Sequence, residues 1–177
     1  MKVITADMNE FSIDDKFDRI VSVEMFEHMR NYEQLLDKVS SWLKPSGKLF
    51  IHIFTHKTLV YPFTEDGEGD WMGRNFFSGG IMPSHQLLLY FQKDLNIDNT
   101  WRFSGVHYEK TSLAWLKKMD SRKKQIMEIF KKSYGVEQAA VWFQRWRIFF
   151  MACEVLFGFD GGKEWGVSHY RFVKPGR

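Results

Sequence analysis

The chain has 177 residues, of which 44% are hydrophobic and 17% aromatic, so it is long enough and apolar enough to fold around a core. Its net charge of +3 arises from 25 basic and 22 acidic residues, a balance that argues against a nucleic-acid-binding protein. A single cysteine, Cys153, excludes an internal disulfide, and the sequence contains neither a signal-peptide core nor an apolar run of membrane-spanning length. We therefore expect a cytoplasmic, soluble protein whose residues 1–177 form a single domain.

Two short strands are predicted near the N-terminus. Residues 2–6 form the first and end at Asp7, a residue type that often caps a turn or a helix. Residues 17–23 are rich in β-branched side chains, a composition typical of a buried parallel strand. In open α/β sheets, ligands bind at the carboxyl ends of the strands. The residues that follow Val23 are therefore the first candidates for a functional site.

Two acids and an imidazole follow this second strand. If the chain becomes helical at once, Glu24, Glu27 and His28 stand at i, i+3 and i+4 and share one face. Neighbouring carboxylates raise one another's pKa, and a carboxylate beside an imidazole favours its charged form, so the group would be a plausible proton acceptor. The alternative is an ordinary acidic first helical turn, which the helix dipole favours without any chemistry.

A crossover unit comes next. Apolar residues recur with a helical period over residues 31–44, and Pro45 and Gly47 end that pattern. Residues 48–56 are predicted to form a buried strand, parallel to residues 17–23 because crossovers are right-handed. His52 lies inside it, and a lone strand histidine is more often a hydrogen-bonded core residue than a functional one.

Two motifs in this region carry a family resemblance. They are Ser22-Val23-Glu24-Met25-Phe26-Glu27-His28-Met29 and Leu43-Lys44-Pro45-Ser46-Gly47-Lys48-Leu49. With them, the chain resembles the second half of a class I S-adenosylmethionine-dependent methyltransferase. The resemblance is to the branch that contains the cyclopropane-fatty-acyl-phospholipid synthases and the coclaurine-type N-methyltransferases. It implies an α/β fold with a partial Rossmann-like sheet that lacks its first strands and carries a helical cap or lid insertion.

The resemblance also implies a cofactor site. Asp7, Met8 and Val23 would bind S-adenosylmethionine, with Asp7 on the adenine amino group. The glycine-rich turn and the ribose-binding carboxylate of such sites would precede Val3, where only two residues stand. We therefore expect a family member that lacks its N-terminal half, and we expect this chain alone to bind the cofactor weakly or not at all. No metal site is predicted.

The remaining chain is predicted to consist of insertions and two strands. Residues 57–100 form a long, aromatic-rich lid segment, with Ser84 as N-cap of a helix over residues 85–94, although plain packing explains the aromatics equally well. Residues 101–108 form a third strand ending at Tyr108. Residues 111–160 form a helical cap, whose apolar part is expected to pack internally rather than on a membrane surface. Residues 165–173 alternate as an edge or antiparallel strand does.

Three functions follow from the resemblance. The first is N-methylation of a small amine, with Glu24, Glu27 and His28 binding the ammonium group and accepting its proton. The second is synthesis of cyclopropane or methyl-branched fatty acyl lipids, with Glu27, His52 and Tyr108 holding a bicarbonate base. The third is a non-catalytic remnant that binds a partner or a membrane surface. In a remnant, the exposed apolar edge of the first sheet strand would favour self-association.

Overall fold

The structure is a computed structural model that describes residues 2–67 and 69–176. Contacts within the chain divide it into two compact units. The first comprises Met1–Phe54, Thr58–Arg102 and Ser168–Arg177, and the second comprises Thr55–Lys57 and Phe103–Val167. Each unit is described on its own.

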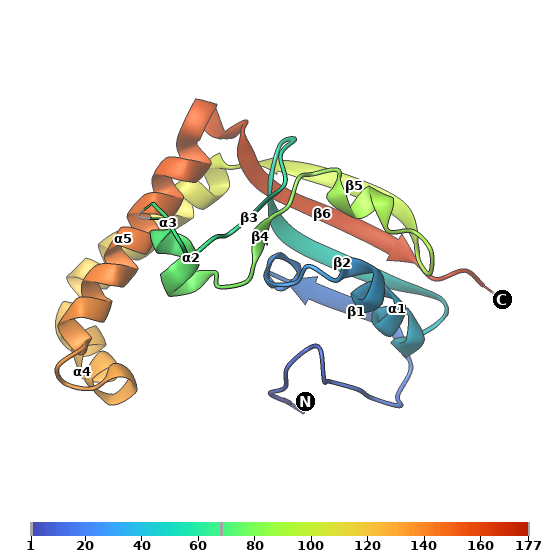
Figure 1. Ribbon diagram of the computed structural model, residues 1–177, viewed down its shortest axis with the longest axis horizontal. Coiled ribbons are helices and arrows are strands. Elements are labelled where there is room, and N and C mark those ends of the chain that lie inside the picture. Colours follow the sequence, from blue (N-terminus) through green and yellow to red (C-terminus); the bar gives the residue numbers. More distant parts are fainter. Residues whose placement is uncertain (1, 68, 177) are drawn as a thin grey trace. The chain divides into compact units, whose positions relative to one another are not determined.

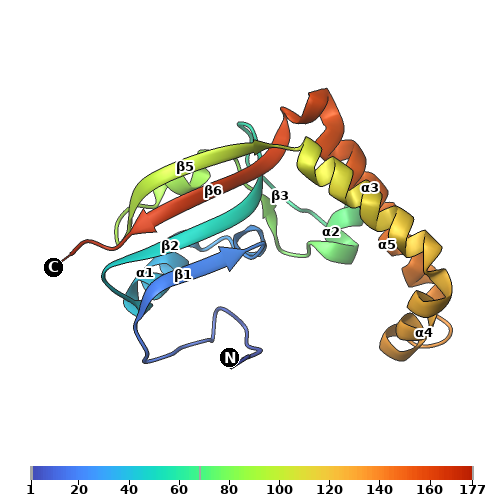
Figure 2. The same ribbon diagram turned by 180° about the vertical axis from the view of Figure 1, so that it is seen from behind.

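A four-stranded sheet of order β1-β2-β6-β5 organises the first unit. Its strands are β1 (Phe17–Val23), β2 (Leu43–His56), β5 (Asn96–Ser104) and β6 (Trp165–Val173). The parallel pairing of β1 with β2, linked by helix α1 (Tyr32–Trp42), is confirmed, and Val23 lies opposite His52 in the register. Figures 1 and 2 show β6 running against the direction of its neighbours. The predicted terminal strand is thus antiparallel, but it lies inside the sheet rather than at its edge.

The core of this unit lies between α1 and the sheet. Helix α1 buries Leu35, Leu36 and Val39, which share one face because they recur at the helical period. The sheet contributes buried side chains from β2 and β6, namely Leu49, Ile51, Ile53, Tyr170 and Phe172. Burying one such side chain contributes about 1.5–3 kcal/mol. This packing fixes the carboxyl end of β1, from which the candidate site extends.

The segment between β2 and β5 contains short elements only. They are β3 (Tyr61–Pro62), α2 (Trp71–Phe76), β4 (Ile81–Met82) and the 3₁₀ helix η2 (Leu87–Tyr90). Strands β3 and β4 pair antiparallel. The helix predicted over residues 85–94 is wrong in type and extent, and no side chain caps η2. Its four residues form a short turn, at the start of which Leu87 N–H donates to the Ser84 carbonyl.

Two further strand predictions need correction. Residues 2–6 form no strand, because the chain there pairs with no sheet neighbour and is exposed. The strand predicted over residues 101–108 ends at Ser104, and helix α3 begins at Val106. Gly105 explains the change of structure: a Cβ there would lie 2.3 Å from the backbone carbonyl oxygens of both Phe157 and Trp165. Only glycine allows this approach, and the chain turns at that point.

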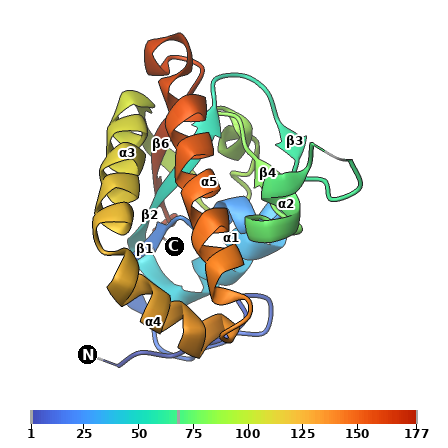
Figure 3. The ribbon, with the colours of Figure 1, turned by 90° about the vertical axis from the view of Figure 1, so that its left-hand side faces the viewer.

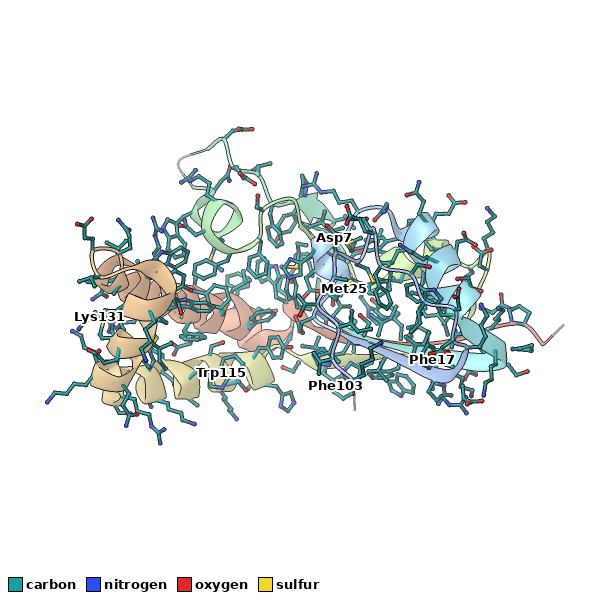
Figure 4. All side chains as sticks on the ribbon, turned by 90° about the horizontal axis from the view of Figure 1, so that it is seen from below. Asp7, Phe17, Met25, Phe103, Trp115 and Lys131 are labelled. Atoms are coloured by element: carbon teal, nitrogen blue, oxygen red, sulfur yellow. The ribbon has the colours of Figure 1, made fainter. Side chains whose placement is uncertain are left out.

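The second unit is built on helices α3 (Val106–Ser121), α4 (Lys123–Tyr134) and α5 (Ala139–Gly158), followed by the 3₁₀ helix η3 (Phe159–Gly162). Figure 3 shows α3 and α5 side by side. They are joined by an edge-to-face contact of Trp115 with Phe150, with ring centroids 5.8 Å apart, and by an ion pair of Arg147 with Asp120 at 2.7 Å. Figure 4 marks Trp115 on α3 and Lys131 on α4. Within the described residues, no helix combines the length and the apolar character that a membrane crossing requires.

Candidate functional site

Glu24, the first residue after β1, has an unusual backbone conformation. Its φ is +50°, in the left-handed region that residues other than glycine seldom adopt and that recurs at functional sites. The conformation is held from the sheet, since Glu24 N–H donates to the His52 carbonyl at 3.0 Å. The expectation that the chain becomes helical at Glu24 is therefore wrong. Instead, a tight turn places the Glu24 carboxylate next to His52 of β2.

Glu27 lies in the 3₁₀ helix η1 (Phe26–His28) and is only 1% exposed. The turn is fixed on one side by the Tyr32 hydroxyl, which donates to the Phe26 carbonyl at 3.0 Å. On the other side, Gly80 is packed so closely that a Cβ there would lie 2.8 Å from the Glu27 carbonyl oxygen. A carboxyl group is thus held at a depth where an isolated charge would be costly.

Glu24 and Glu27 interact although they do not share a helix. Burial, and then the hydrogen bond and the negative charge of Glu24, together raise the pKa of Glu27 to about 9. Glu27 is therefore protonated at neutral pH. Its Oε2 atom is buried and has no hydrogen-bond partner among the described residues. A buried polar atom without a hydrogen bond destabilises the fold unless a ligand binds to it. The pair is therefore a candidate binding site for a polar ligand.

His52 connects Glu24 to a further histidine. Its Nε2 lies 3.0 Å from Glu24 Oε1, and its Nδ1 lies 2.8 Å from Nε2 of His169, in β6. Burial, with the positive charge of His52, lowers the pKa of His169. His52 is thus a hydrogen-bonded residue, as the sequence favoured, but its partners are titratable side chains.

His28 is placed differently from the two acids. Successive side chains of a 3₁₀ helix point about 120° apart. His28 is accordingly exposed, whereas Glu27 is buried. Its ring stacks on Phe77, with centroids 5.7 Å apart. The prediction that Glu24, Glu27 and His28 occupy one face is therefore wrong. Phe77 also contacts Phe54 and Phe63, which extends an aromatic surface from His28.

The three predicted cofactor residues lie along or near one cavity. It has a volume of about 520 Å³ and is bordered by the N-terminal segment, by β1 and by α1; Met8 and Val23 line it. Figure 4 marks Asp7, and also Phe17 and Met25, which stand at the beginning of β1 and just beyond its end. Asp7 is exposed, and its Oδ1 accepts the Asn9 N–H at 2.8 Å. Its present hydrogen bond is the turn-capping alternative that the sequence left open.

Tyr108 belongs to the second unit and lies in the first turn of α3 rather than on a strand. Its ring packs edge-to-face on Phe157, with centroids 5.0 Å apart. Sequence reasoning did not select His169 for the site. The available signal was a polar residue among buried neighbours in an alternating strand, but the sequence alone did not reveal that β6 pairs with β2.

The chain is similar in sequence and fold to known proteins. Residues 1–161 match the mycolic acid cyclopropane synthetase family. The chain is 39% identical to (S)-coclaurine N-methyltransferase of Papaver somniferum over 177 residues, covering 98% of this chain and 50% of the relative. A crystal structure of coclaurine N-methyltransferase bound to N-methylheliamine and SAH is 36% identical, with a TM-score of 0.88, covering 97% of this chain and 52% of that one.

A cyclopropane synthase structure from Mycobacterium tuberculosis shares the fold. It is 20% identical with a TM-score of 0.76, covering 98% of this chain and 60% of that chain. The chain spans about half the length of the curated relatives it matches. The α/β fold with a partial set of strands is thus confirmed. The chain belongs to the mycolic acid cyclopropane synthetase family, as its sequence motifs predicted.

Proposed function

We propose that this chain is part of an S-adenosylmethionine-dependent enzyme that methylates the nitrogen of a small amine. The observation that carries the proposal is the pair formed by Glu24 and the buried Glu27, whose Oε2 atom has no hydrogen-bond partner among the described residues. Support comes also from the names of the relatives, several of which are plant N-methyltransferases.

The first element of the proposal is the cofactor. Met8 and Val23 line the cavity beside β1, and so does Ser22, whose buried hydroxyl has no hydrogen-bond partner among the described residues. An apolar cavity with an unpartnered polar atom suits a nucleoside with an apolar ring and hydroxyl groups. We propose that Asp7, Met8 and Val23 hold part of S-adenosylmethionine there. When bound, this group supplies a methyl carbon already activated by the sulfonium charge.

The second element is the proton of the amine. A protonated amine has no lone pair for attack, so it must give up a proton before transfer. With Glu27 protonated at neutral pH, the acid pair carries one negative charge, which attracts an ammonium group. Glu24 is the member able to accept the proton, and Glu27 Oε2 accepts a hydrogen bond from the amine. The pair thereby binds and orients the acceptor while it removes the blocking proton.

The aromatic surface gives the acceptor a second contact. Phe63 and Phe77 are partly exposed, and their ring centroids lie 5.1 Å apart beside His28. Aromatic rings attract cations and pack well against apolar bodies. We therefore propose an amine that carries an apolar or aromatic body, with His28 and Phe77 at its outer side. The role of the segment over residues 57–100 as a lid belongs to the same proposal.

His52 favours the amine over the lipid alkene. The lipid mechanism would use His52, with Glu27 and Tyr108, to hold bicarbonate. Both ring nitrogens of His52 already have protein partners, Glu24 and His169. Bicarbonate would have to displace one of them, at the cost of a hydrogen bond that His52 already makes.

A chimera tests the proposed function. The chain replaces the matching half of the Papaver somniferum enzyme, and methyl transfer is measured with a small secondary amine and with a monounsaturated phospholipid. We expect transfer to the amine. In the chimera, Glu27→Gln should abolish transfer and leave cofactor binding intact, whereas Glu10→Gln at an exposed position should do neither. Transfer to the lipid alone, or full turnover by Glu27→Gln, contradicts the proposal.

Self-association is a separate proposal. Val21 and Val23 of β1 are 65% and 58% exposed, and β1 is an edge strand of the sheet as described. Exposed apolar edge strands pair with other chains. We expect the isolated chain to form dimers or larger species in sedimentation velocity experiments, and Val21→Lys to shift it toward the monomer. A monomer at all concentrations would contradict this.

A further inference from the structure

A continuous row of hydrogen-bonding side chains leads away from the acid pair. Glu24 Oε1 contacts His52 Nε2 at 3.0 Å, and His52 Nδ1 contacts His169 Nε2 at 2.8 Å. The three residues come from the end of β1, from β2 and from β6, which are neighbours in the sheet. The Glu24 backbone is bound to the His52 carbonyl as well. The row is therefore fixed by the sheet and does not depend on mobile loops.

The row offers a way to remove the proton that each reaction cycle leaves on the acid pair. Each methylation of an ammonium acceptor leaves a proton on Glu24, beside Glu27, which already holds one. A doubly protonated pair has lost its charge and can neither attract nor deprotonate the next acceptor. The proton must leave before another turnover. The Glu27 side chain is buried, whereas 33% of Glu24 and 23% of His52 is accessible. An acceptor bound to the acid pair would cover the accessible part of Glu24, and the row then offers the proton a path that the acceptor does not block.

We propose that His52 and His169 form a proton relay that discharges Glu24, with His169 as the residue that delivers the proton to solvent. The inference rests on the proposed function. In each cycle an N–H bond of the acceptor breaks and a Glu24 O–H bond forms. Glu24 then gives this proton to His52 Nε2, while His52 Nδ1 gives its own proton to His169 Nε2. His169 releases a proton to water, and both rings return to their starting tautomers by proton exchange with solvent.

The surroundings of His169 suit this task. Its ring packs against Phe50 with centroids 5.0 Å apart, a contact that holds its orientation. Charged and titratable groups on this part of the sheet include Glu24, His52, Lys48 and Asp98 on neighbouring elements and Arg171 on β6 itself. Asp98 pairs with both Lys48 and Arg171, at 3.3 Å and 2.6 Å, so these cations are compensated. His52 contacts His169 directly, and burial, with the positive charge of His52, lowers the pKa of His169.

The relay makes a prediction that does not require catalysis. In the 177-residue chain labelled with ¹⁵N-histidine, we expect the titration of His169 to be coupled to His52, because a charged His52 ring disfavours charge on His169. His52→Gln should therefore raise the pKa of His169 toward that of an ordinary histidine. His107→Gln, at an exposed position in the second unit, should leave it unchanged. A pKa of His169 that does not respond to His52→Gln would overturn the relay.

The kinetic test uses the chimera described above. We expect His169→Gln to lower kcat for the amine by roughly 10-fold, less than the loss of a general base itself. KM should change little, since His169 does not touch the acceptor. In His169→Ala, added imidazole should restore much of kcat, which a purely structural defect would not allow. His107→Gln provides the matched control.

The outcomes separate the two proposals. An active parent chimera whose His169 variants match His107→Gln in rate and pH profile overturns the relay and leaves the proposed function standing. A parent chimera that methylates no amine overturns the proposed function and the relay with it. A rate loss that imidazole restores, with the coupled titration, supports both.

Discussion

Glu27 retains a proton that an ordinary glutamic acid would lose, because it is buried and faces the negative charge of Glu24. Its pKa is raised from 4.5 to about 9. Between these values the folded chain holds a proton that the unfolded chain has released. Stability from this group is therefore fully present below about pH 4.5 and falls as pH rises toward 9. This dependence is opposite to that of an ion-paired carboxylate.

The pH dependence of unfolding tests this protonation state. Because one pKa unit corresponds to about 1.4 kcal/mol, we expect the unfolding free energy to fall by about 2–4 kcal/mol between pH 5 and pH 8 through Glu27 alone. Glu27→Gln should remove that part of the slope, as urea denaturation at several pH values will measure. Glu10→Gln, at an exposed position, should leave the slope intact. Equal slopes in the parent and in Glu27→Gln would contradict the raised pKa.

Tyr32 supports the turn that carries Glu27. Its hydroxyl is buried and donates to the Phe26 carbonyl, so Tyr32→Phe should lower the unfolding free energy by about 1 kcal/mol. Tyr90→Phe removes the same atom from a residue that is 77% exposed and should cost less than about 0.5 kcal/mol. Thermal or urea unfolding measures both. A loss as large in Tyr90→Phe would show that the hydrogen bond is not the cause.

The sequence identified the two acids of the site but did not predict how their side chains come into contact. Glu24 and Glu27 were selected from their place after a strand, and that place is right. Their contact, however, arises from a left-handed residue at Glu24 and a short 3₁₀ helix, which depend on the neighbouring His52 carbonyl. Such distant backbone partners leave no periodic signal in the sequence, and His169 was missed for the same reason.

Elements with a repeating apolar pattern were predicted well. Helix α1 and strand β6 lie within a few residues of their expected bounds because burial on one face imposes a period on the sequence. Strand β1, predicted from its β-branched composition, has the expected bounds, but the prediction that it is buried is wrong, because most of its residues are exposed. The start of α3 at Val106 and the short turn η2 were not predicted. Both are set by close contacts with remote segments, such as the carbonyl groups that surround Gly105.

Gly80, which precedes β4, packs against the turn that carries Glu27. Its carbonyl accepts from Arg30 Nη2 at 3.1 Å, and added bulk would press on the Glu27 carbonyl. We expect Gly80→Ala to destabilise the chain by about 1–3 kcal/mol and, in the chimera, to lower kcat. Gly69→Ala is the matched control, because nothing lies within 4 Å of its Cβ position. Urea unfolding measures the stability of both variants, and methyl-transfer assays measure their kcat in the chimera. Equal stability and equal kcat in the two variants would show that Gly80 does not constrain the site.

At the scale of the whole molecule, the sheet as described presents one side of a ligand cavity. The cavity beside β1 is lined almost entirely by apolar side chains, and Val23 at its border is 58% exposed. A nucleoside cofactor needs polar partners for its hydroxyl and charged groups as well as an apolar wall. The described residues provide the apolar wall but few polar partners. We therefore expect them to bind the cofactor only weakly.

Calorimetry on two molecules tests this account of the cavity. We expect the 177-residue chain to bind S-adenosylmethionine with a Kd weaker than about 1 mM, a free energy of less than about 4 kcal/mol, and the chimera to bind it in the micromolar range. In the chimera, Val23→Lys should weaken binding at least about 10-fold, because it places a charged side chain in the apolar lining of the cavity. Val3→Lys, at a residue that is 79% exposed and outside the cavity lining, should leave binding unchanged. Micromolar binding by the chain alone would contradict this prediction. It would mean that the residues of this chain already provide the polar contacts that the cofactor needs.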